Sequence, residues 1–572
     1  MSIEEHSRSG DNSSPGPAKN DTTVGAYILA RLRDAGAGHV FGVPGDYSLG
    51  FMDHIVESDL ELVGTCNELN AGYAADAYAR MRGIGAVAVT YAVGGFSVLN
   101  AIAGAYAERV PVVALCGGPS RADREGGLKR HHTLGDYGIQ LRVFDAVTEL
   151  AVALESAERA PDQIDAAIRA CLQKRRPVFI EIPADLVNAA CIAPEPLQWE
   201  SALPSDAAIL EEAVSEAADL LTRAQRPLIL GGVEVHRFGL GPALEELIEH
   251  AGYPVATALM GKSLIDETNP HFVGLYSGAL SEASVRETVE GADCVLNLGA
   301  FMSDINLGVY TAKIPTKHLI HATPEGVQIK HHHFDRVFLG DFIRELRKAL
   351  PRATGPDPRI RPAARSRLQP FEARPEQALT IQRFYQRVNH ILEKNHVVLA
   401  DAGDSFMCAG DLLMHEQTGF ISQAFYCSIG FTLPGALGVG LAKRDHRPIV
   451  FIGDGAFQMV AQELSTLLRQ RLNPVIFVMN NRGYTVERVI HDGPYNDIQN
   501  WRYHELVGVF GADAGWGCEV RTEGELEAAI GRASQDRDRL ALIEVHLDPM
   551  DCSAALRRLG TELRHSNALD EG

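Results

Sequence analysis

The stretch RPIVFIGDGAFQMVAQELSTLLRQRLNPVIFVMNNRG, residues 447–483, holds the most informative pattern in the chain. Two apolar runs, at 447–452 and 474–479, have the length and composition of buried strands, and residues 456–470 between them are predicted to form a helix. A strand, a helix and a strand in this order form a parallel pair, whose carboxyl ends lie at one edge of the sheet. The stretch therefore predicts an α/β domain built on a parallel sheet.

A polar turn follows each of the two strands. The letters GDG, at 453–455, follow the first strand, and NNRG, at 480–483, follow the second. Asp454 and Asn481 should therefore lie side by side at the edge where α/β sheets bind ligands. Their oxygens suit Mg²⁺, and the glycines beside a helix start let the backbone approach a diphosphate. GDG alone is common in strand-to-helix turns, whereas the two turns at this spacing form a specific pattern.

The same alternation of strands and helices recurs along the chain. It predicts an α/β fold of three doubly wound domains with parallel sheets, at residues 22–192, 205–350 and 379–552. Pro-containing stretches without periodicity separate the domains, and the second of these linkers covers residues 351–378. Residues 1–21 are predicted to be a disordered tail and residues 553–572 a polar C-terminal tail.

Composition excludes several classes of function. Of the 572 residues, 46% are apolar, and the formal net charge of −21 disfavours nucleic acid and anionic membrane surfaces as partners. No apolar run approaches the roughly 20 residues of a membrane span. The nine cysteines form no CxxC pair, and the first 20 residues lack the apolar core of a signal peptide. We expect a cytoplasmic protein with reduced thiols.

The pattern at 453–483 resembles the binding motif of the enzymes that depend on thiamine diphosphate (ThDP). The resemblance extends over residues 22–550, and in particular to the pyruvate, indolepyruvate and branched-chain 2-oxo-acid decarboxylases. It implies a pyrimidine-binding N-terminal domain, a non-catalytic middle domain and a diphosphate-binding C-terminal domain. It also implies ThDP and Mg²⁺ as cofactors, with Asp454, Asn481 and the Gly483 carbonyl as metal ligands.

The resemblance assigns further residues to the cofactor. Ile429 matches the bulky residue that holds ThDP in a bent shape, although an ordinary core isoleucine is the alternative reading at this position. Ala456 stands where the family often has serine, so one hydroxyl contact to the diphosphate is missing. The other implied contacts are Gly403, Asp404, Ser405, Ser428, Gly453, Gly455 and Tyr484.

Glu68 matches the glutamate that the family places against the pyrimidine ring. A carboxylic acid there lets ThDP form its nucleophilic ylid, so that the cofactor can act as an electron sink. Glu68 lies in the letters NELN, at 67–70, after a predicted strand. Taken alone, a glutamate at this place is more often a helix cap or a solvated charge.

Three further pieces are typical of the decarboxylases: Asp46 at a strand end, His131-His132 in a loop, and Glu487 just after the metal motif. Together they supply two imidazoles and two carboxylates, which suit proton transfer near neutral pH. Each is ambiguous alone, since Asp46 could cap a helix and adjacent histidines usually face opposite ways. The family brings them into one pocket from two subunits.

The resemblance implies non-oxidative decarboxylation of a 2-oxo acid to an aldehyde and CO₂, through a ThDP ylid and an enamine. Ala402, Phe406, Val486 and Ile490 match the substrate pocket, and the first three predict a branched-chain or aromatic 2-oxo acid larger than pyruvate. A homodimer or homotetramer is the expected assembly. The alternatives are a ThDP-dependent carboligase, a regulatory protein that binds ThDP without turnover, and a metal hydrolase using the surface histidines 331–333, for which no HExxH motif is present.

Overall fold

The structure of the chain is a computed structural model. It describes residues 21–570 apart from 197–198, 200–203, 315, 356, 358–359, 361–369 and 416–417. The tail predicted at 1–21 therefore lies outside the described residues except for Asp21, and the linker predicted at 351–378 lies partly outside them. Within the described part of the chain, no helix combines the length and the apolar character needed to cross a membrane.

The N-terminal domain is a six-stranded sheet, all parallel, with the strand order β3-β2-β4-β5-β7-β6. A small antiparallel pair of β1 and β8 joins its two ends. Its elements are β1 (Asp21–Thr23), α1 (Val24–Asp34), β2 (His39–Gly42), α2 (Leu49–Glu57), β3 (Glu61–Gly64), α3 (Glu68–Arg82), β4 (Gly85–Thr90), α4 (Val93–Ala107), β5 (Val112–Gly118), α5 (Arg121–Glu125), α6 (Ile139–Asp145), β6 (Leu150–Ala153), α7 (Ala160–Lys174), β7 (Val178–Pro183) and β8 (Ala190–Ile192).

The middle domain has a seven-stranded sheet in the order β11-β10-β9-β12-β13-β14-β15. Five strands are parallel, and the last two form an antiparallel hairpin that the sequence pattern did not predict. Its main elements are α8 (Ala207–Arg223), β9 (Pro227–Gly231), α9 (Val233–Arg237), α10 (Gly241–Ala251), β10 (Val255–Ala258), β11 (Phe272–Tyr276), α11 (Ala283–Glu290), β12 (Cys294–Leu298), β13 (Leu319–Ala322), β14 (Gly326–Ile329), β15 (His332–Asp335) and α12 (Leu339–Ala349).

The C-terminal domain is again a six-stranded parallel sheet, in the order β17-β16-β18-β19-β21-β20. Its main elements are α14 (Ile381–Val388), β16 (His396–Ala400), α15 (Asp404–Ala409), β17 (Gly419–Ile421), α16 (Thr432–Ala442), β18 (Arg447–Gly453), α17 (Asp454–Val460), α18 (Leu464–Arg469), β19 (Val475–Asn480), α19 (Thr485–Ile490), α20 (Leu506–Gly511), β20 (Gly515–Val520), α21 (Glu523–Gln535), β21 (Leu540–His546) and α22 (Ala554–Asp570).

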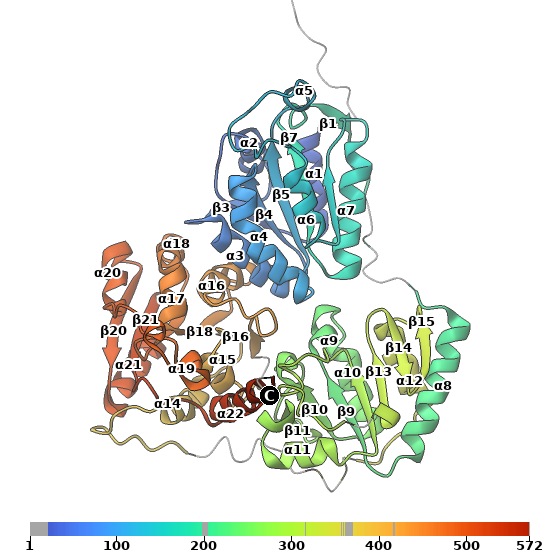
Figure 1. Cartoon of the computed structure of the whole chain (residues 1–572), viewed down its shortest axis with the longest axis vertical. Helices are drawn as coiled ribbons and strands as arrows, with labels where there is room; N and C mark the ends of the chain where they lie inside the picture. The colour runs from blue at the N-terminus through green and yellow to red at the C-terminus, as the bar shows by residue number, and fades with distance from the viewer. Residues whose placement is uncertain are drawn as a thin grey trace, which may run out of the picture.

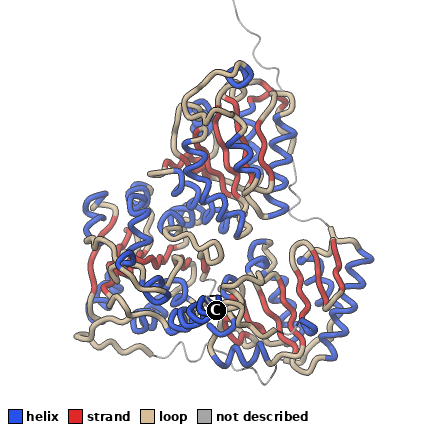
Figure 2. Tube along the Cα trace, in the orientation of Figure 1, coloured by secondary structure: helices blue, strands red, loops and turns tan. Residues whose placement is uncertain are grey.

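The predicted fold class is confirmed: three domains, each with helices on both faces of a mostly parallel sheet (Figures 1 and 2). The helix predicted at 456–470 is interrupted, because a 3-10 turn at Ala461–Glu463 separates α17 from α18. That turn points the buried carboxylate of Glu463 at the N-terminal domain, where it accepts hydrogen bonds from the Cys66 backbone N–H and the Asn70 amide, at 3.2 and 2.8 Å.

The prediction that residues 553–572 form a polar tail is wrong. Residues 554–570 form helix α22, in which Leu556 and Leu559 are buried in the core of the C-terminal domain. The spacing of Leu556, Leu559 and Leu563 is that of one helix face, and this face packs beside α15 and α19. The part of α22 up to Leu563 is therefore packed into the domain rather than extended from it.

The N-terminal and C-terminal domains share one core where α3 lies against α16 (Figure 1). Every residue of α16 is buried, so this helix is apolar all round, as expected of a helix enclosed between two domains. The two backbones come very close, because a Cβ atom added to Gly438 would lie only 2.1 Å from the Ala74 carbonyl oxygen. A residue without a side chain is required at this crossing.

Gly438→Ala should lower the free energy of unfolding by about 1–3 kcal/mol, because the added methyl group must force α3 and α16 apart. Thermal unfolding followed by circular dichroism measures the effect. Gly531→Ala in α21 is the matched control, since a Cβ atom there meets nothing within 4 Å and alanine is the better helix former. A Gly438→Ala protein as stable as the control would contradict the packing described for this junction.

Candidate active site

A cavity of about 290 Å³ opens at the carboxyl edge of the C-terminal sheet. Asp454 begins α17 directly after β18, and Asn481 follows β19, so both reach the cavity from adjacent strand ends, as the sequence predicted. Its lining includes Ile305, Ala402, Gly403, Asp404, Ser405, Phe406, Met407, Ile429, Gly453, Asp454, Gly455, Ala456, Met479, Asn481, Gly483, Tyr484, Val486, Glu487, Leu556 and Leu559.

Three oxygens converge at the position predicted for the metal. The side-chain oxygen of Asn481 lies 2.7 Å from the Gly483 carbonyl oxygen and 3.3 Å from Asp454 Oδ1, and it faces only acceptors. Rotating the amide would turn these approaches into hydrogen bonds, whereas a hard cation between the oxygens makes the arrangement favourable as it stands. Asp454 Oδ2 is buried and has no hydrogen-bond partner among the described residues. The donor set therefore fits a divalent metal such as Mg²⁺.

Burial controls the charge of this site. Asp454 is fully buried, and desolvation raises the pKa of its carboxyl group to about 6, although the backbone N–H of Gly455 donates a hydrogen bond to it. A bound cation would offset that desolvation by favouring the ionised form. The Gly483 backbone has a φ of 149°, and a Cβ atom there would lie 2.1 Å from the Asn496 carbonyl oxygen, so only glycine places its carbonyl in this turn.

The loop that carries Ile429 is held by two buried carboxylates. On one side, Asp401 accepts hydrogen bonds from the backbone N–H groups of Gly430 and Thr432, at 2.9 and 3.0 Å, and from the Thr432 hydroxyl. Desolvation raises the pKa of Asp401 to about 6. Ile429 lines the cavity, whereas Ser428 is absent from the described lining and instead contacts Asn100 Nδ2 at 3.3 Å.

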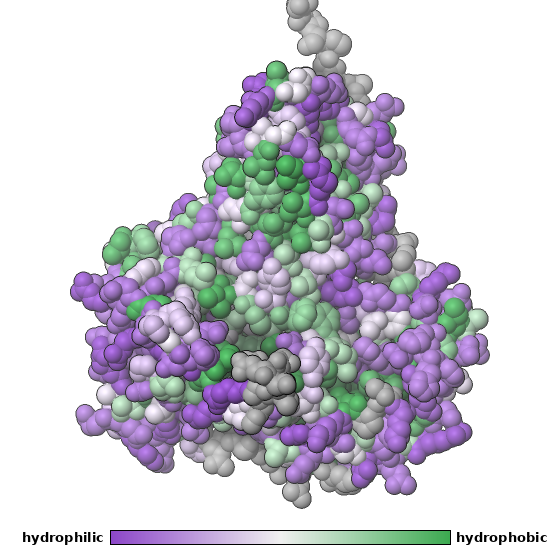
Figure 3. Space-filling view, in the orientation of Figure 1, coloured by the Kyte–Doolittle hydropathy of each residue, from purple (hydrophilic) through white to green (hydrophobic). Residues whose placement is uncertain are grey.

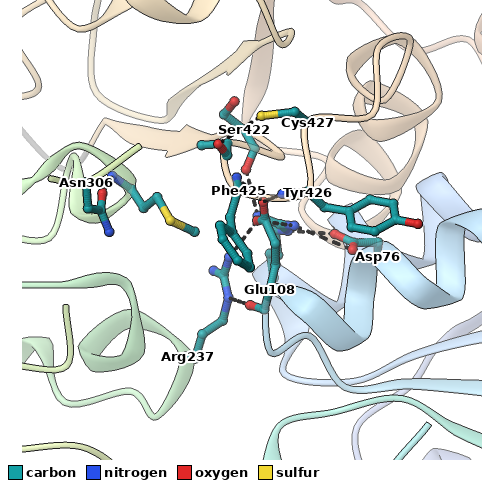
Figure 4. Close-up of polar contacts among 11 residues, drawn as sticks. Asp76, Glu108, Arg237, Asn306, Ser422, Phe425, Tyr426 and Cys427 are labelled. Carbon is teal, nitrogen blue, oxygen red and sulfur yellow. Dashed lines mark hydrogen bonds and ion pairs between the residues drawn. The ribbon is translucent and has the colours of Figure 1, made fainter. Parts of the chain in front are cut away.

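On its other side, the loop is held by Glu108 from the N-terminal domain (Figure 4). Glu108 is fully buried, and its Oε1 accepts the backbone N–H groups of Phe425 and Tyr426, at 2.7 and 3.2 Å. Its Oε2 lies 3.1 Å from Arg80, which also pairs with Asp76 and donates to a loop carbonyl. Residues 422–431, between β17 and α16, are hereafter called the cofactor loop because Ile429 is predicted to contact ThDP. This loop is thus fixed in part by a charge network outside its own domain.

The middle domain joins the same network. Arg237, the last residue of α9, donates from Nε to the Glu108 backbone carbonyl at 3.0 Å and lies 3.8 Å from the Glu108 carboxylate (Figure 4). Desolvation, with the nearby charge of Arg80, lowers the pKa of Arg237 to about 9. All three domains therefore meet around the Glu108 carboxylate. Glu108 does not line the cavity itself, but it binds the loop whose Ile429 does.

The other predicted acid/base residues gather in the N-terminal domain. Asp46 Oδ2 lies 2.5 Å from His131 Nε2, and the His131 and His132 rings stand edge to face with centroids 4.7 Å apart. Neither Asp46 nor Glu68 is a helix cap, since α2 begins after Ser48 and the side chain of Asn67 makes the cap hydrogen bond of α3. Glu68 is the first residue of α3, and its carboxylate lies beside Gly94.

The two groups of predicted residues do not meet within one chain. Every described residue that lines the cavity belongs to the middle or the C-terminal domain, so Glu68, Asp46, His131 and His132 contribute nothing to it. In Figure 1, the loop after α5 that carries the histidines lies far from α17 and α19. A single chain therefore presents only part of the predicted site.

Three of the four residues predicted for the substrate pocket line the cavity, namely Ala402, Phe406 and Val486. Ile490, at the end of α19, is not among the described lining residues, and the role of all four stays a prediction. The structure adds Leu556 and Leu559 from α22 and Ile305 from the middle domain. The periodic leucines of α22 were a usable signal in the sequence, but no local pattern marks Ile305.

Comparison with known families agrees with this geometry. Residues 22–139 match "Thiamine pyrophosphate enzyme, N-terminal TPP binding domain", residues 214–350 match the central domain of the same enzymes, and residues 401–545 match their C-terminal TPP binding domain. Thiamine pyrophosphate is another name for ThDP. The chain belongs to the ThDP-dependent enzymes, and its cofactors are ThDP and a divalent metal such as Mg²⁺.

Relatives that align over nearly the whole chain define the branch. "Pyruvate decarboxylase 2" of Oryza sativa subsp. japonica is 38% identical, with 97% of this chain and 93% of the relative covered. "Pyruvate decarboxylase 4" of Arabidopsis thaliana is 37% identical, with 97% and 94% covered, and "Pyruvate decarboxylase 1" of Pisum sativum is 37% identical, with 96% and 95% covered. Within the ThDP-dependent enzymes, the chain is a member of the 2-oxo-acid decarboxylase family.

Glu108→Gln should weaken ThDP binding and destabilise the protein by about 3–5 kcal/mol, because it leaves Arg80 and Arg237 buried beside a neutral amide. Isothermal titration calorimetry with ThDP and Mg²⁺ measures the affinity, and thermal unfolding measures the stability. Glu57→Gln, at the exposed end of α2, is the matched control. Unchanged ThDP affinity and stability in Glu108→Gln would show that the network does not hold the cofactor loop.

Proposed function

We propose that the chain converts a 2-oxo acid into an aldehyde and CO₂ without an external oxidant. The observation that carries the proposal is the cluster of Asp454, Asn481 and Gly483 oxygens in a cavity that Glu487 and Ile429 also line. Bound ThDP supplies the nucleophilic carbon and the electron sink that the loss of a carboxylate requires. The protein side chains then have to bind the cofactor, orient the substrate and move protons.

Each predicted residue takes one of these tasks in the proposal. Asp454, Asn481 and the Gly483 carbonyl hold the metal, and Ile429 packs against the cofactor. Glu487 stands in the cavity beside the departing carboxylate. Glu68 holds a proton against the pyrimidine ring, while Asp46, His131 and His132 deliver protons to the product side. The contact between Asp46 and His131 supports this last role, because it gives a carboxylate and an imidazole within one hydrogen bond of each other.

We further propose that two chains build each site. The described residues that line the cavity all belong to the middle and C-terminal domains, which supports a site that receives Glu68, Asp46 and the histidines from another chain. The N-terminal domain exposes a hydrophobic area over α4, where Val93 is 56% exposed (Figure 3). Exposed apolar area of this kind is typical of a protein interface. A homodimer is the smallest assembly that completes the site, and a tetramer of two such dimers remains a prediction.

Co-expressed Glu68→Gln and Asp454→Ala chains should recover about one quarter of the wild-type activity, since half of randomly paired dimers are mixed and each has one intact site of two. Each variant alone should be inactive. The control pairs Asp454→Ala with Asn481→Ala, two changes in the same cavity, and should recover nothing. Recovery in the control, or full activity from a monomer in light scattering, would contradict a shared site.

The substrate preference is a separate proposal. The names of the relatives favour pyruvate, whereas the small side chains of Ala402 and Val486 and the Phe406 ring leave space for a longer substrate. We propose that a branched-chain or aromatic 2-oxo acid is preferred and that pyruvate is a poorer substrate. The nine cysteines, none of which forms a disulfide, support a reducing compartment, and a cytoplasmic location remains our prediction.

Val486→Ile should shift the preference toward pyruvate by roughly tenfold or more, the usual effect of one methylene in a fitted pocket. The measurement is kcat/KM for pyruvate, 3-methyl-2-oxobutanoate and phenylpyruvate, with products identified by mass spectrometry. Val509→Ile, on the exposed face of α20, is the matched control and should change nothing. Pyruvate as the best substrate of the wild type would overturn the preference, and acyloins as the main products would overturn the proposed reaction.

A further inference from the structure

The acid/base group of the N-terminal domain has the composition of a transition-metal site. Asp46, His131 and His132 each present one ligand atom, and the three atoms lie within 4.8 Å of one another. Among the residues that the structure describes, no other three His, Cys, Asp or Glu side chains converge in this way. Two imidazole nitrogens and one carboxylate oxygen form a ligand set that zinc commonly takes, with the fourth position left open.

Backbone geometry explains how two adjacent histidines reach one point. His132 has a φ of 66°, in the left-handed region that residues other than glycine rarely adopt. This turn brings both rings to the same side of the loop, where the sequence alone suggested opposite directions. A conformation of this kind costs about 1 kcal/mol or more and persists only when neighbouring contacts hold it.

Those contacts come from Tyr47. Its ring stacks on His131 with centroids 4.9 Å apart and an angle of 21°, and it meets His132 edge to face at 5.9 Å. The nearby Arg130 is neutralised by Asp123 at 2.6 Å, so it does not oppose a cation. His132 Nδ1 is buried and has no hydrogen-bond partner among the described residues. The three ligands are thus placed before any ion arrives.

The chemistry separates this group from the site at Asp454. That site offers only oxygens, which suit Mg²⁺, whereas imidazole nitrogens favour Zn²⁺, Co²⁺, Ni²⁺ and Cu²⁺. Excess Mg²⁺ should therefore fill the Asp454 site and leave the histidines free. The two ions can be told apart in one sample because they prefer different ligands.

We propose that Asp46, His131 and His132 bind a first-row transition-metal ion, Zn²⁺ in particular, as a second metal site distinct from the Mg²⁺ site. Occupation ties up the groups assigned above to proton transfer. Zinc therefore inhibits the enzyme without displacing Mg²⁺ or ThDP. The inhibition rests on the proposed function, whereas the binding does not.

Calorimetric titration of Zn²⁺ into the holoenzyme, with ThDP and excess Mg²⁺ present, tests the binding without turnover. Wild type should take up one tight Zn²⁺ per chain. Asp46→Asn and His131→Ala should each weaken the binding by at least the roughly 10–100-fold that loss of an outer-shell partner costs, because each removes a direct ligand. Co²⁺ in place of Zn²⁺ should give visible absorption bands of a low-symmetry site, absent in both variants.

Two control variants test whether an exposed histidine or thiol elsewhere in the chain accounts for the zinc binding. His332→Ala removes the exposed histidine that pairs with Glu216 at 2.7 Å, and Cys66→Ser removes an exposed thiol. Both should bind Zn²⁺ as the wild type does. Loss of binding in either control, together with unchanged binding in Asp46→Asn and His131→Ala, would overturn the proposal.

Activity is read separately. Zinc added at saturating substrate should stop CO₂ release while ThDP and Mg²⁺ stay bound, and a chelator selective for zinc should restore it. Zinc binding at the wild-type strength with undiminished CO₂ release would overturn the inhibition. A zinc-free holoenzyme, with ThDP and Mg²⁺ bound, that releases no CO₂ from any 2-oxo acid would overturn the proposed function. The calorimetric test of zinc binding does not depend on that result.

Discussion

The parallel pairing of β18 and β19 is the constraint on which the rest of the structure depends. Their register sets Gly453 opposite Met479, so both strands end together and the chain leaves each of them at the same edge of the sheet. Asp454 lies one residue beyond Gly453 and Asn481 two residues beyond Met479, so the parallel pairing brings their oxygens within reach of one ion. The cavity, the metal donors and the position of Glu487 all follow from this edge.

The loop beside this edge of the C-terminal sheet is held in part by the N-terminal domain. Ile429 sits on a loop whose two ends are tied to buried carboxylates, Asp401 from the same domain and Glu108 from the N-terminal domain. A buried carboxylate is unfavourable unless its charge is compensated, and Arg80 provides that compensation in the packed region beside α3 and α16. Removing the Glu108 carboxylate leaves Arg80 with Asp76 as its remaining ion-pair partner and takes from Arg237 the carboxylate that lies 3.8 Å away. The domain junction and the shape of the cofactor loop are therefore one structural unit, and changes at the junction are expected to be felt in the cavity.

Sequence reasoning was reliable where short-range chemistry decided the outcome. The strand–helix–strand pattern around Asp454 and Asn481 predicted that the two side chains lie close together. The reason is that the carboxyl ends of adjacent parallel strands share one edge of the sheet in any α/β fold. Sequence reasoning failed where contacts between segments far apart in the sequence determine the local structure. The break of the helix at Ala461–Glu463 reflects a carboxylate that bonds the N-terminal domain, and Ile305 reaches the cavity from a domain without any marked pattern. The prediction of a polar tail in place of helix α22 was wrong because Leu556, Leu559 and Leu563 lie among charged and polar residues, although their spacing was visible.

The proposed division of the site between two chains would explain why Asp46 and His131 are so exposed. The side chains of His131 and Asp46 are 59% and 49% exposed, which is unusual for groups that have to control protons in a catalytic pocket. A partner chain that covers them would remove this water and strengthen every charge interaction among them. The Tyr47 stack and the left-handed His132 backbone keep the three side chains converged before that partner arrives. In a shared site, preorganisation by one chain and desolvation by the other would therefore act on the same residues. The convergence that suits proton transfer also creates an affinity for transition metals.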